Sequence, residues 1–305
     1  MTLPNFLVIG AAKSGTTSLM QYLDQHPEVF MCPVKTHFFD LDRDPTRFCG
    51  FDKVSQRGGF IITELAEYEA IFEAAGEAIA IGETCDVYLS SEEAAQRIHH
   101  YIPHVKLIAV LRQPADRAFS AYTHMLRDGK ETLSFADALA QEPQRIAENY
   151  APIWHYLRRG FYYEQIKMYM DLFGPDQLLV FLYDDLCEDA QGLLRDAFQF
   201  LGVDPEYQVD ASIQYNVSGL PRSKMVHAIH DLIAKPNRLK ALVKTFIPTR
   251  RVRGIARRFK NRLRMRNLEK PEFQAELRQS LTEDFREDIL KLQNVLQRDL
   301  SMWLA

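Results

Sequence analysis

Short apolar runs alternate with stretches of helical periodicity over much of the chain. Strands that are buried on both faces are continuously apolar, and helices on such a sheet repeat their apolar residues every three or four positions. The runs that predict strands are Asn5–Ile9, Ala78–Gly82, Val105–Leu111 and Gln177–Tyr183, and the periodic segments between them are Thr16–Asp24, a stretch around Ser91–Tyr101, and Tyr162–Phe173. This alternation predicts an α/β fold of three layers, a central parallel sheet flanked by helices.

The C-terminal part of the chain carries one long apolar stripe within Glu272–Leu300. Its members follow one another at spacings of 4, 4, 4, 3 and 4: Leu277, Leu281, Phe285, Ile289, Leu292 and Leu296. The stripe predicts a long closing helix packed on the domain. Because the 305 residues contain no internal repeat and no low-complexity linker, we expect a single domain over residues 1–305.

The first predicted strand runs into the segment GAAKSGTTSL, Gly10 to Leu19. A turn from strand to helix presents unpaired N–H groups and the positive end of the helix dipole, so an anion binds well there. Two glycines let backbone approach a ligand, and the side chains that would donate to it are Lys13, Ser14, Thr16, Thr17 and Ser18, around Gly15. An ordinary Ser/Thr helix cap is the simpler alternative, but a cap needs neither the lysine nor three consecutive hydroxyls.

The loop differs from that of a nucleotide kinase or NTPase. Those proteins place the lysine after the second glycine and directly before the residue that holds Mg²⁺, whereas here Lys13 and Ser14 precede Gly15. The strands that follow end in Glu83-Thr84 and Arg112-Gln113, without a clear magnesium ligand. We therefore expect a phosphate site without metal.

Charge is spread unevenly along a chain whose net charge is −4. Between Arg222 and Arg266 there are fifteen Lys and Arg residues against one acid, Asp231, about +14 in 45 residues. Because the net charge is negative and no recognised nucleic-acid-binding module is present, nucleic-acid binding is a poor interpretation. The four cysteines form neither a C-x-x-C motif nor a His/Cys cluster, so we predict no zinc site and no disulfide framework, and a reduced, cytoplasmic protein.

Several motifs in order along the chain resemble the sulfotransferases that use 3′-phosphoadenosine 5′-phosphosulfate (PAPS), especially their heparan-sulfate-type and bacterial branch. The similar segments are KSGTTSL, THFF (36–39), GET (82–84), VLRQPADRAFSAYTH (110–124), the stretch from Arg158 to Leu186, and NVSGLPRSK (216–224). The resemblance implies a PAPS-dependent sulfotransferase with PAP as the nucleotide product. A P-loop kinase or NTPase, and a PAPS-binding protein without activity, stay open as alternatives.

The resemblance also implies roles for individual residues. The loop from Lys13 to Ser18 would hold the 5′-phosphosulfate, and Lys13 would stabilise the departing oxygen. Arg112 and Ser120 would hold the 3′-phosphate; Ser120 lies on a predicted helix from Pro114 to Arg127. Arg222 and Lys224 would close over the nucleotide.

Two positions depart from the family pattern. The branch has a glutamate base where this chain has Lys35, and an assisting lysine where it has Thr84. Since imidazole titrates near neutral pH, we predict that His37 accepts the acceptor's proton and that Lys35 replaces the lost positive charge. His124, Glu83 and Asp86 are the alternatives for the base.

The acceptor side is less defined by the sequence. Asp40–Phe60 and Ala151–Phe161 (Trp154, Tyr156, Phe161) either wall an acceptor site or are packed loop and core. The basic segment, about 225–268, is expected to be a helical insertion; its part Ile247–Leu268 is amphipathic and either contacts an anionic membrane peripherally or forms a solvated or subunit-contacting face. The expected acceptor is a carbohydrate, a lipid head group or a small metabolite. No apolar stretch near the N-terminus is long enough for a signal or an anchor.

Overall fold

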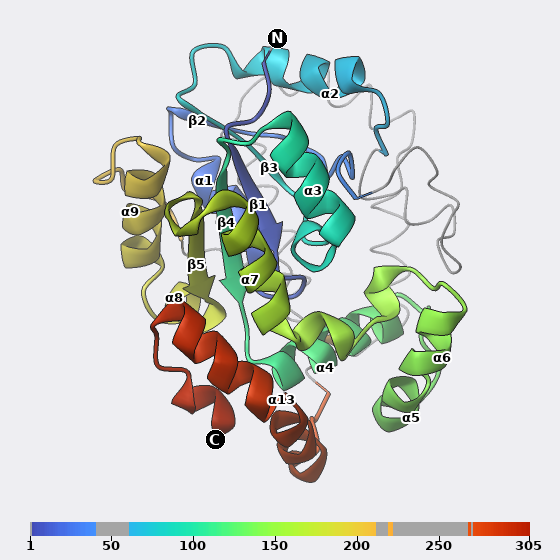
Figure 1. The fold of residues 1–305 in the computed structure, drawn as a ribbon. Helices are drawn as coiled ribbons and strands as arrows, with labels where there is room; N and C mark the ends of the chain where they lie inside the picture. The colour runs from blue at the N-terminus through green and yellow to red at the C-terminus, as the bar shows by residue number, and fades with distance from the viewer. Residues whose placement is uncertain (1, 41–60, 212–218, 222–267, 270) are drawn as a thin grey trace.

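The centre of the fold is a parallel five-stranded sheet (Figure 1). The computed structural model describes residues 2–40, 61–211, 219–221, 268–269 and 271–305. The strands are β1 (Phe6–Gly10), β2 (Val29–Met31), β3 (Ala80–Thr84), β4 (Lys106–Leu111) and β5 (Leu178–Leu182). Their order in the sheet is β2-β3-β1-β4-β5. The chain therefore turns to opposite sides of β1, and the crevice at the carboxyl end of such a strand is where open α/β sheets bind ligands.

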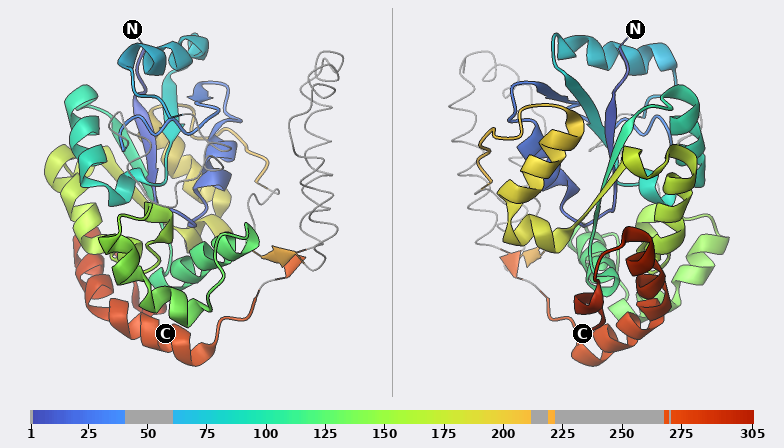
Figure 2. Two further views of the ribbon diagram at one scale, coloured as in Figure 1. Left: turned by 90° about the vertical axis from the view of Figure 1, so that its right-hand side faces the viewer. Right: turned by 60° about the vertical axis from the view of Figure 1, so that its left-hand side comes forward.

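Helices cover both faces of this sheet (Figure 2). One face carries α2 (Leu65–Phe72), α3 (Glu92–Tyr101), α7 (Tyr162–Phe173) and the long α13 (Ala275–Leu296), and the other carries α1 (Thr16–Leu23), α8 (Tyr183–Glu188) and α9 (Ala190–Leu201). At the carboxyl edge α4 (Pro114–Arg127) packs with α5 (Phe135–Ala140), near α6 (Glu142–Ala147). None of the helices in the described ranges is long and apolar enough to cross a membrane.

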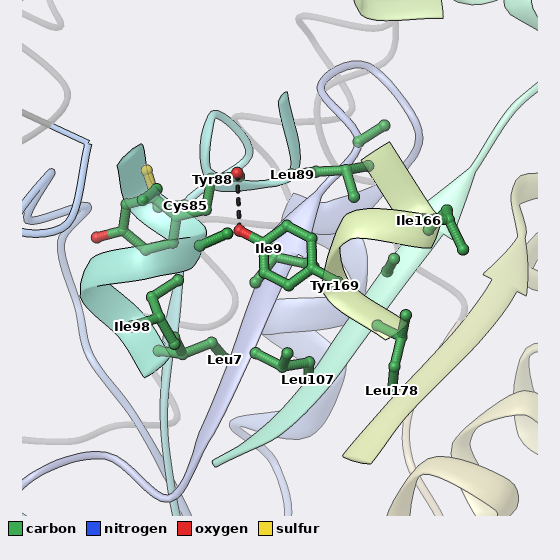
Figure 3. Packing of buried hydrophobic residues seen from close by; sticks show 14 of the residues in the cluster. Leu7, Ile9, Cys85, Tyr88, Leu89, Ile98, Leu107, Ile166, Tyr169 and Leu178 are labelled. Atoms are coloured by element: carbon green, nitrogen blue, oxygen red, sulfur yellow. Dashed lines mark hydrogen bonds between the residues drawn. The ribbon is translucent and has the colours of Figure 1, made fainter. Parts of the chain in front are cut away.

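The apolar core lies directly against the sheet. Figure 3 shows part of it, where Ile166 and Tyr169 of α7 meet Leu7 and Leu107 of the sheet. The Tyr169 hydroxyl is fully buried and donates a hydrogen bond of 2.8 Å to the Tyr88 carbonyl oxygen. That bond satisfies the one polar atom that the ring brings into this core.

The four predicted strands and the alternating helices are confirmed, with ends that differ by at most two residues. The predicted helix Pro114–Arg127 has the same bounds in the structure, and Ser91 caps α3 by accepting a hydrogen bond from the Ala94 N–H. In α13 the predicted stripe is buried at its centre. The sequence analysis missed β2, whose three residues are too few to show a pattern.

A two-stranded antiparallel ribbon joins two distant parts of the chain. It consists of β6 (Leu220–Pro221) and β7 (Leu268–Glu269), in which Leu220 pairs with Glu269. The backbone therefore enters and leaves the segment 222–267 at neighbouring points. The predicted insertion itself, about 225–268, lies outside the described residues apart from Leu268.

Candidate functional site

The loop between β1 and α1 lies at the carboxyl end of the central strand. Lys13 and Gly15 both have positive φ, 71° and 88°, which turns the backbone sharply before α1 begins at Thr16. A side chain at Gly15 would meet Leu186 Cδ2 at 2.7 Å, so both conformation and space require glycine there. The first turn of α1 contains Thr16, Thr17 and Ser18, and the loop from Lys13 to Ser18 is thus one continuous turn at the positive end of a helix.

Helix α4 brings a second set of polar residues to the same loop. Arg112, two residues before it, donates from Nη1 to the Lys13 carbonyl oxygen at 3.3 Å, and its guanidinium lies 4.8 Å from the centre of the Tyr183 ring. Further along, Ser120, His124 and Arg127 follow at spacings of four and three, so they share one helical face. Sequence reasoning missed Arg127, although its helical spacing from Ser120 was available to find it.

The loop is crowded with positive charge. Burial, together with Arg127 and Arg112, lowers the pKa of Lys13 to about 8, while Asp86 acts in the opposite direction. Within the described residues, Lys13 has no carboxylate at ion-pair distance. A lysine held near other cations at a cost, with no carboxylate of its own at ion-pair distance, is the arrangement that a polyanionic ligand completes.

Glu83, next to the end of β3, belongs to the interior rather than to this cationic loop. The side chain is fully buried, and its carboxylate accepts hydrogen bonds from the Thr36 N–H and hydroxyl and from the hydroxyls of Tyr68 and Tyr88, at 2.5 to 3.2 Å. Burial raises its pKa in spite of these donors. Glu83 therefore anchors the segment after β2 to the sheet. Its neighbour Thr84 is also buried, and the Thr84 Oγ1 has no hydrogen-bond partner among the described residues.

Lys35 and Asp86 form an ion pair that faces the loop. The Lys35 Nζ lies 2.6 Å from Asp86 Oδ1, and the two side chains are 32% and 21% exposed. Arg159, which the sequence analysis did not select, donates at 2.6 Å to the Asp86 carbonyl oxygen. Although burial opposes it, the charges of Lys35 and Arg159 hold the pKa of Asp86 well below its usual range. The positive charge predicted at Lys35 is thus present but paired.

His37 has a positive φ of 54° and is held by its neighbours. Its Nδ1 lies 3.1 Å from both carboxylate oxygens of Asp40 and 3.7 Å from Cys85 Sγ. Burial lowers the pKa of His37, but Cys85 and the Asp40 carboxylate more than offset this, so the pKa lies well above its usual value. Burial raises the pKa of the Cys85 thiol. Hydrogen bonding to a thiol and a carboxylate accounts for this cluster, and the expectation of a metal-free site stays a prediction.

The remaining predicted residues have different outcomes. Trp154 and Tyr156 are buried in the core beneath α4 and α5, and Phe161, 40% exposed, packs against Phe285, so the described part of 151–161 is mainly core. His124 accepts at Nδ1 from Arg127 Nη2 at 2.8 Å, and burial near Lys13 lowers its pKa to about 3. Arg222, Lys224 and most of the segment 40–60 lie outside the described residues.

Comparisons with known proteins agree with this architecture. A family model described as the sulfotransferase family matches residues 4–207. Human bifunctional heparan sulfate N-deacetylase/N-sulfotransferase 3 is 27% identical over 224 residues, which cover 70% of this chain and 24% of that protein. Mouse heparan sulfate glucosamine 3-O-sulfotransferase 3A1 is 29% identical over 201 residues, or 66% of this chain and 46% of that protein. The chain thus spans less than half the length of these two curated relatives.

A solved structure is similar along the whole chain. It is that of a sulfotransferase from Alicyclobacillus acidocaldarius, with 32% sequence identity, a TM-score of 0.76 and coverage of 100% of both chains. The likeness therefore includes the β1–α1 loop and α4, the two elements that bring the cationic residues together.

Proposed function

Because the chain belongs to the sulfotransferase family, we propose that it transfers a sulfuryl group from PAPS to a hydroxyl or amine of an acceptor. The observation that carries this proposal is Lys13, which lies near the charges of Arg112 and Arg127 and has no carboxylate at ion-pair distance within the described residues. PAPS carries negative charge at both its 5′-phosphosulfate and its 3′-phosphate. Two clusters of donors, one on the loop and one on α4, match the two ends of such a ligand.

The residues that would hold PAPS follow from this arrangement. The N–H groups and hydroxyls from Ser14 to Ser18 would bind the 5′-phosphosulfate together with Lys13. Arg112 and Ser120 would bind the 3′-phosphate, since a guanidinium at the end of β4 can grip a phosphate with two hydrogen bonds. Arg127 extends the same helical face and adds charge near Lys13. Arg222 and Lys224 keep their predicted role of closing over the nucleotide.

Sulfuryl transfer depends mainly on positioning and on electrostatic stabilisation. Lys13 would hold the oxygen that becomes negative when the sulfuryl group departs. On the acceptor side lie His37, oriented by Asp40, and Lys35, paired with Asp86. His37 as the proton acceptor stays a prediction, and its raised pKa means that it would be neutral, and able to accept a proton, only in more alkaline solution.

The acceptor in this proposal is a carbohydrate, a lipid head group or a small metabolite. Two of the relatives are named for sulfation of heparan sulfate, which supports a carbohydrate first. A cytoplasmic location, and peripheral contact with a membrane through residues 247–268, stay predictions.

Isothermal titration calorimetry with PAP and AMP tests the nucleotide site. We expect PAP to bind at least tenfold more tightly than AMP, because only PAP has the 3′-phosphate. Arg112→Ala should remove most of that preference and weaken AMP binding little. Arg195→Ala, on α9 and paired with Glu206, is the matched control. Equal affinity for PAP and AMP in the native protein would refute the proposal, and magnesium-dependent ATP turnover would indicate a kinase or NTPase instead.

A further inference from the structure

Asp86 is a carboxylate whose charge acts on Lys13, and one of its oxygens has no partner among the described residues. Its Oδ1 accepts from Lys35 at 2.6 Å, and Arg159 fixes its backbone carbonyl group. Its Oδ2 has no hydrogen-bond partner among the described residues, and a fifth of the side chain is exposed. Lys35 therefore holds the carboxylate in place and leaves one oxygen available to a ligand.

Asp86 also lies within electrostatic reach of the groups that would handle the sulfuryl group. Its charge raises the pKa of Lys13, and it acts in the same direction on His124. It follows β3, the strand that pairs with β1, by two residues, and so lies at the carboxyl edge of the sheet. An acceptor that attacks a sulfuryl group held by Lys13 would thus pass close to Asp86.

Two of the other candidate bases are already occupied. Both oxygens of Glu83 accept hydrogen bonds from tyrosines or Thr36 in the fully buried interior. Neutral His124 accepts at Nδ1 from Arg127, so its proton lies on Nε2, which faces Asp128 at 3.5 Å. Complete burial keeps Glu83 out of an acceptor's reach, and the one ring lone pair of neutral His124 is used by Arg127.

His37 has neighbours that favour its protonated form. The Asp40 carboxylate lies 3.1 Å from Nδ1, and, despite burial, Cys85 and this carboxylate raise the pKa of the ring above its usual value. An imidazolium donates from both nitrogens and cannot accept a proton. Despite burial, the charges of Lys35 and Arg159 lower the pKa of Asp86 and so favour its carboxylate form.

From these contacts we infer that Asp86 Oδ2, held in place by Lys35, accepts the proton of the acceptor in the transfer that the proposed function describes. The acceptor oxygen forms a bond to sulfur, and the bond from sulfur to the bridging oxygen of PAPS breaks, so that PAP leaves with that electron pair. The acceptor's proton passes to Asp86 Oδ2, and the carboxylic acid then returns it to water. No metal, oxidant or other reactant is needed for this balance.

A weakly basic carboxylate can accept the acceptor's proton if that proton is transferred after the bond to sulfur has begun to form. A free hydroxyl is far less acidic than a carboxylic acid, so Asp86 takes no proton before the reaction. As the bond to sulfur forms, the oxygen becomes positive and its proton becomes strongly acidic, and even a carboxylate of low pKa then accepts it. Lys35 is a positioning residue in this account: it fixes Oδ1 and leaves Oδ2 free.

Steady-state kinetics on the full chain test the inference, with radiolabelled PAPS and the best acceptor from a panel of sugars, phenols and primary alcohols. We expect Asp86→Asn to lower kcat by about 10²–10³-fold, the usual contribution of a positioned acid or base. Asp86→Glu should recover part of that loss, and His37→Gln should lose at least tenfold less than Asp86→Asn. Asp171→Asn, on the outer surface of α7, is the matched control. Calorimetry with PAP shows whether each variant still folds and binds nucleotide.

The pH profile gives a second, independent result. Lys35→Met removes the cation that lowers the pKa of Asp86, so the acidic limb of kcat/KM should move up by about one pH unit or more. A merely structural Asp86 would leave the limb in place, and that result would overturn the inference. So would a loss below tenfold in Asp86→Asn, or an equal loss in His37→Gln. Failure of the native protein to bind PAP or use PAPS would instead refute the proposed function.

Discussion

Glu83 and Asp86 are three residues apart at the end of one strand, yet they occupy opposite environments. Glu83 points into the core, where hydroxyls and a backbone N–H surround it, and burial raises its pKa. Asp86 lies at the cationic edge, where Lys35 and Arg159 more than offset burial and lower its pKa. The strand thus changes from scaffold to candidate site within three positions.

The difference shows how to separate structural carboxylates from reactive ones. A fully buried carboxylate whose oxygens both have donors stabilises the fold and is out of a ligand's reach. A carboxylate with one oxygen held and one free is both oriented and available. If this distinction is right, substitutions at Glu83 should change stability and substitutions around Asp86 should change turnover.

The largest effect is expected at Lys13, the cation whose pKa the charge of Asp86 raises. Lys13→Met should lower kcat by about 10²–10³-fold, because a donor aimed at developing negative charge contributes that much in other enzymes. The free energy of unfolding should stay the same or rise, since the variant removes a buried charge without a partner at ion-pair distance. Turnover with labelled PAPS and urea denaturation measure the two quantities. A large loss of unfolding free energy in Lys13→Met would contradict the distinction between a reactive edge and a structural core.

The reverse pattern is expected at Glu83. Glu83→Ala leaves three buried donor side chains without their acceptor and should cost about 3–5 kcal/mol of unfolding free energy. Asp86→Ala should cost about 1 kcal/mol or less, because its partner Lys35 can reach water. Urea denaturation followed by circular dichroism compares the two variants directly. Equal losses of unfolding free energy in the two variants would show that both carboxylates contribute equally to stability.

A smaller effect is expected from pH. Lys13 is charged below its pKa of about 8 and neutral above it. PAP is an anion and favours the charged form, so its affinity should be highest below pH 8 and fall as pH rises through that value. We expect about a tenfold loss between pH 7 and 9, measured by calorimetry. In Lys13→Met the same pH range should give a much flatter curve; a parallel fall there would assign the titration to another group.

The smallest effect is expected at Thr84, between the two carboxylates. Its buried hydroxyl has no partner among the described residues, so Thr84→Val removes an unsatisfied polar atom at nearly constant volume. The unfolding free energy should change by less than about 1 kcal/mol, or rise. Weaker PAP binding in this variant would show that the hydroxyl serves the ligand; a large loss of stability would contradict its being unpaired.

Much of the fold could be predicted because its signals are local. Continuous apolar runs indicated β1, β3, β4 and β5, and the stripe of α13 could be read from residue spacing alone. The strand β2 could not be found in this way, since its three residues at the sheet edge show no period. Its place in the sheet depends on pairing with β3, a contact between distant parts of the sequence.

The sequence predicted those parts of the candidate site whose residues lie together in one continuous segment. The phosphate loop and the start of α4 are continuous segments, and their residues were selected from the sequence. The Lys35–Asp86 pair joins residues 51 positions apart, and Arg159 reaches Asp86 from 73 positions away. Neighbouring charges and hydrogen bonds, acting against burial, then raise the pKa of His37 and lower that of Asp86, and no single segment of the sequence shows these neighbours.

The short ribbon of β6 and β7 defines where the segment between its two strands can be removed or replaced. Because Leu220 and Glu269 are opposite one another, a tight turn can join the two strands and replace everything between them without stretching the flanking backbone. The strongly basic stretch can therefore be excised or exchanged as a cassette. Exchanging this segment between homologous proteins would show which properties depend on the segment and which depend on the rest of the fold.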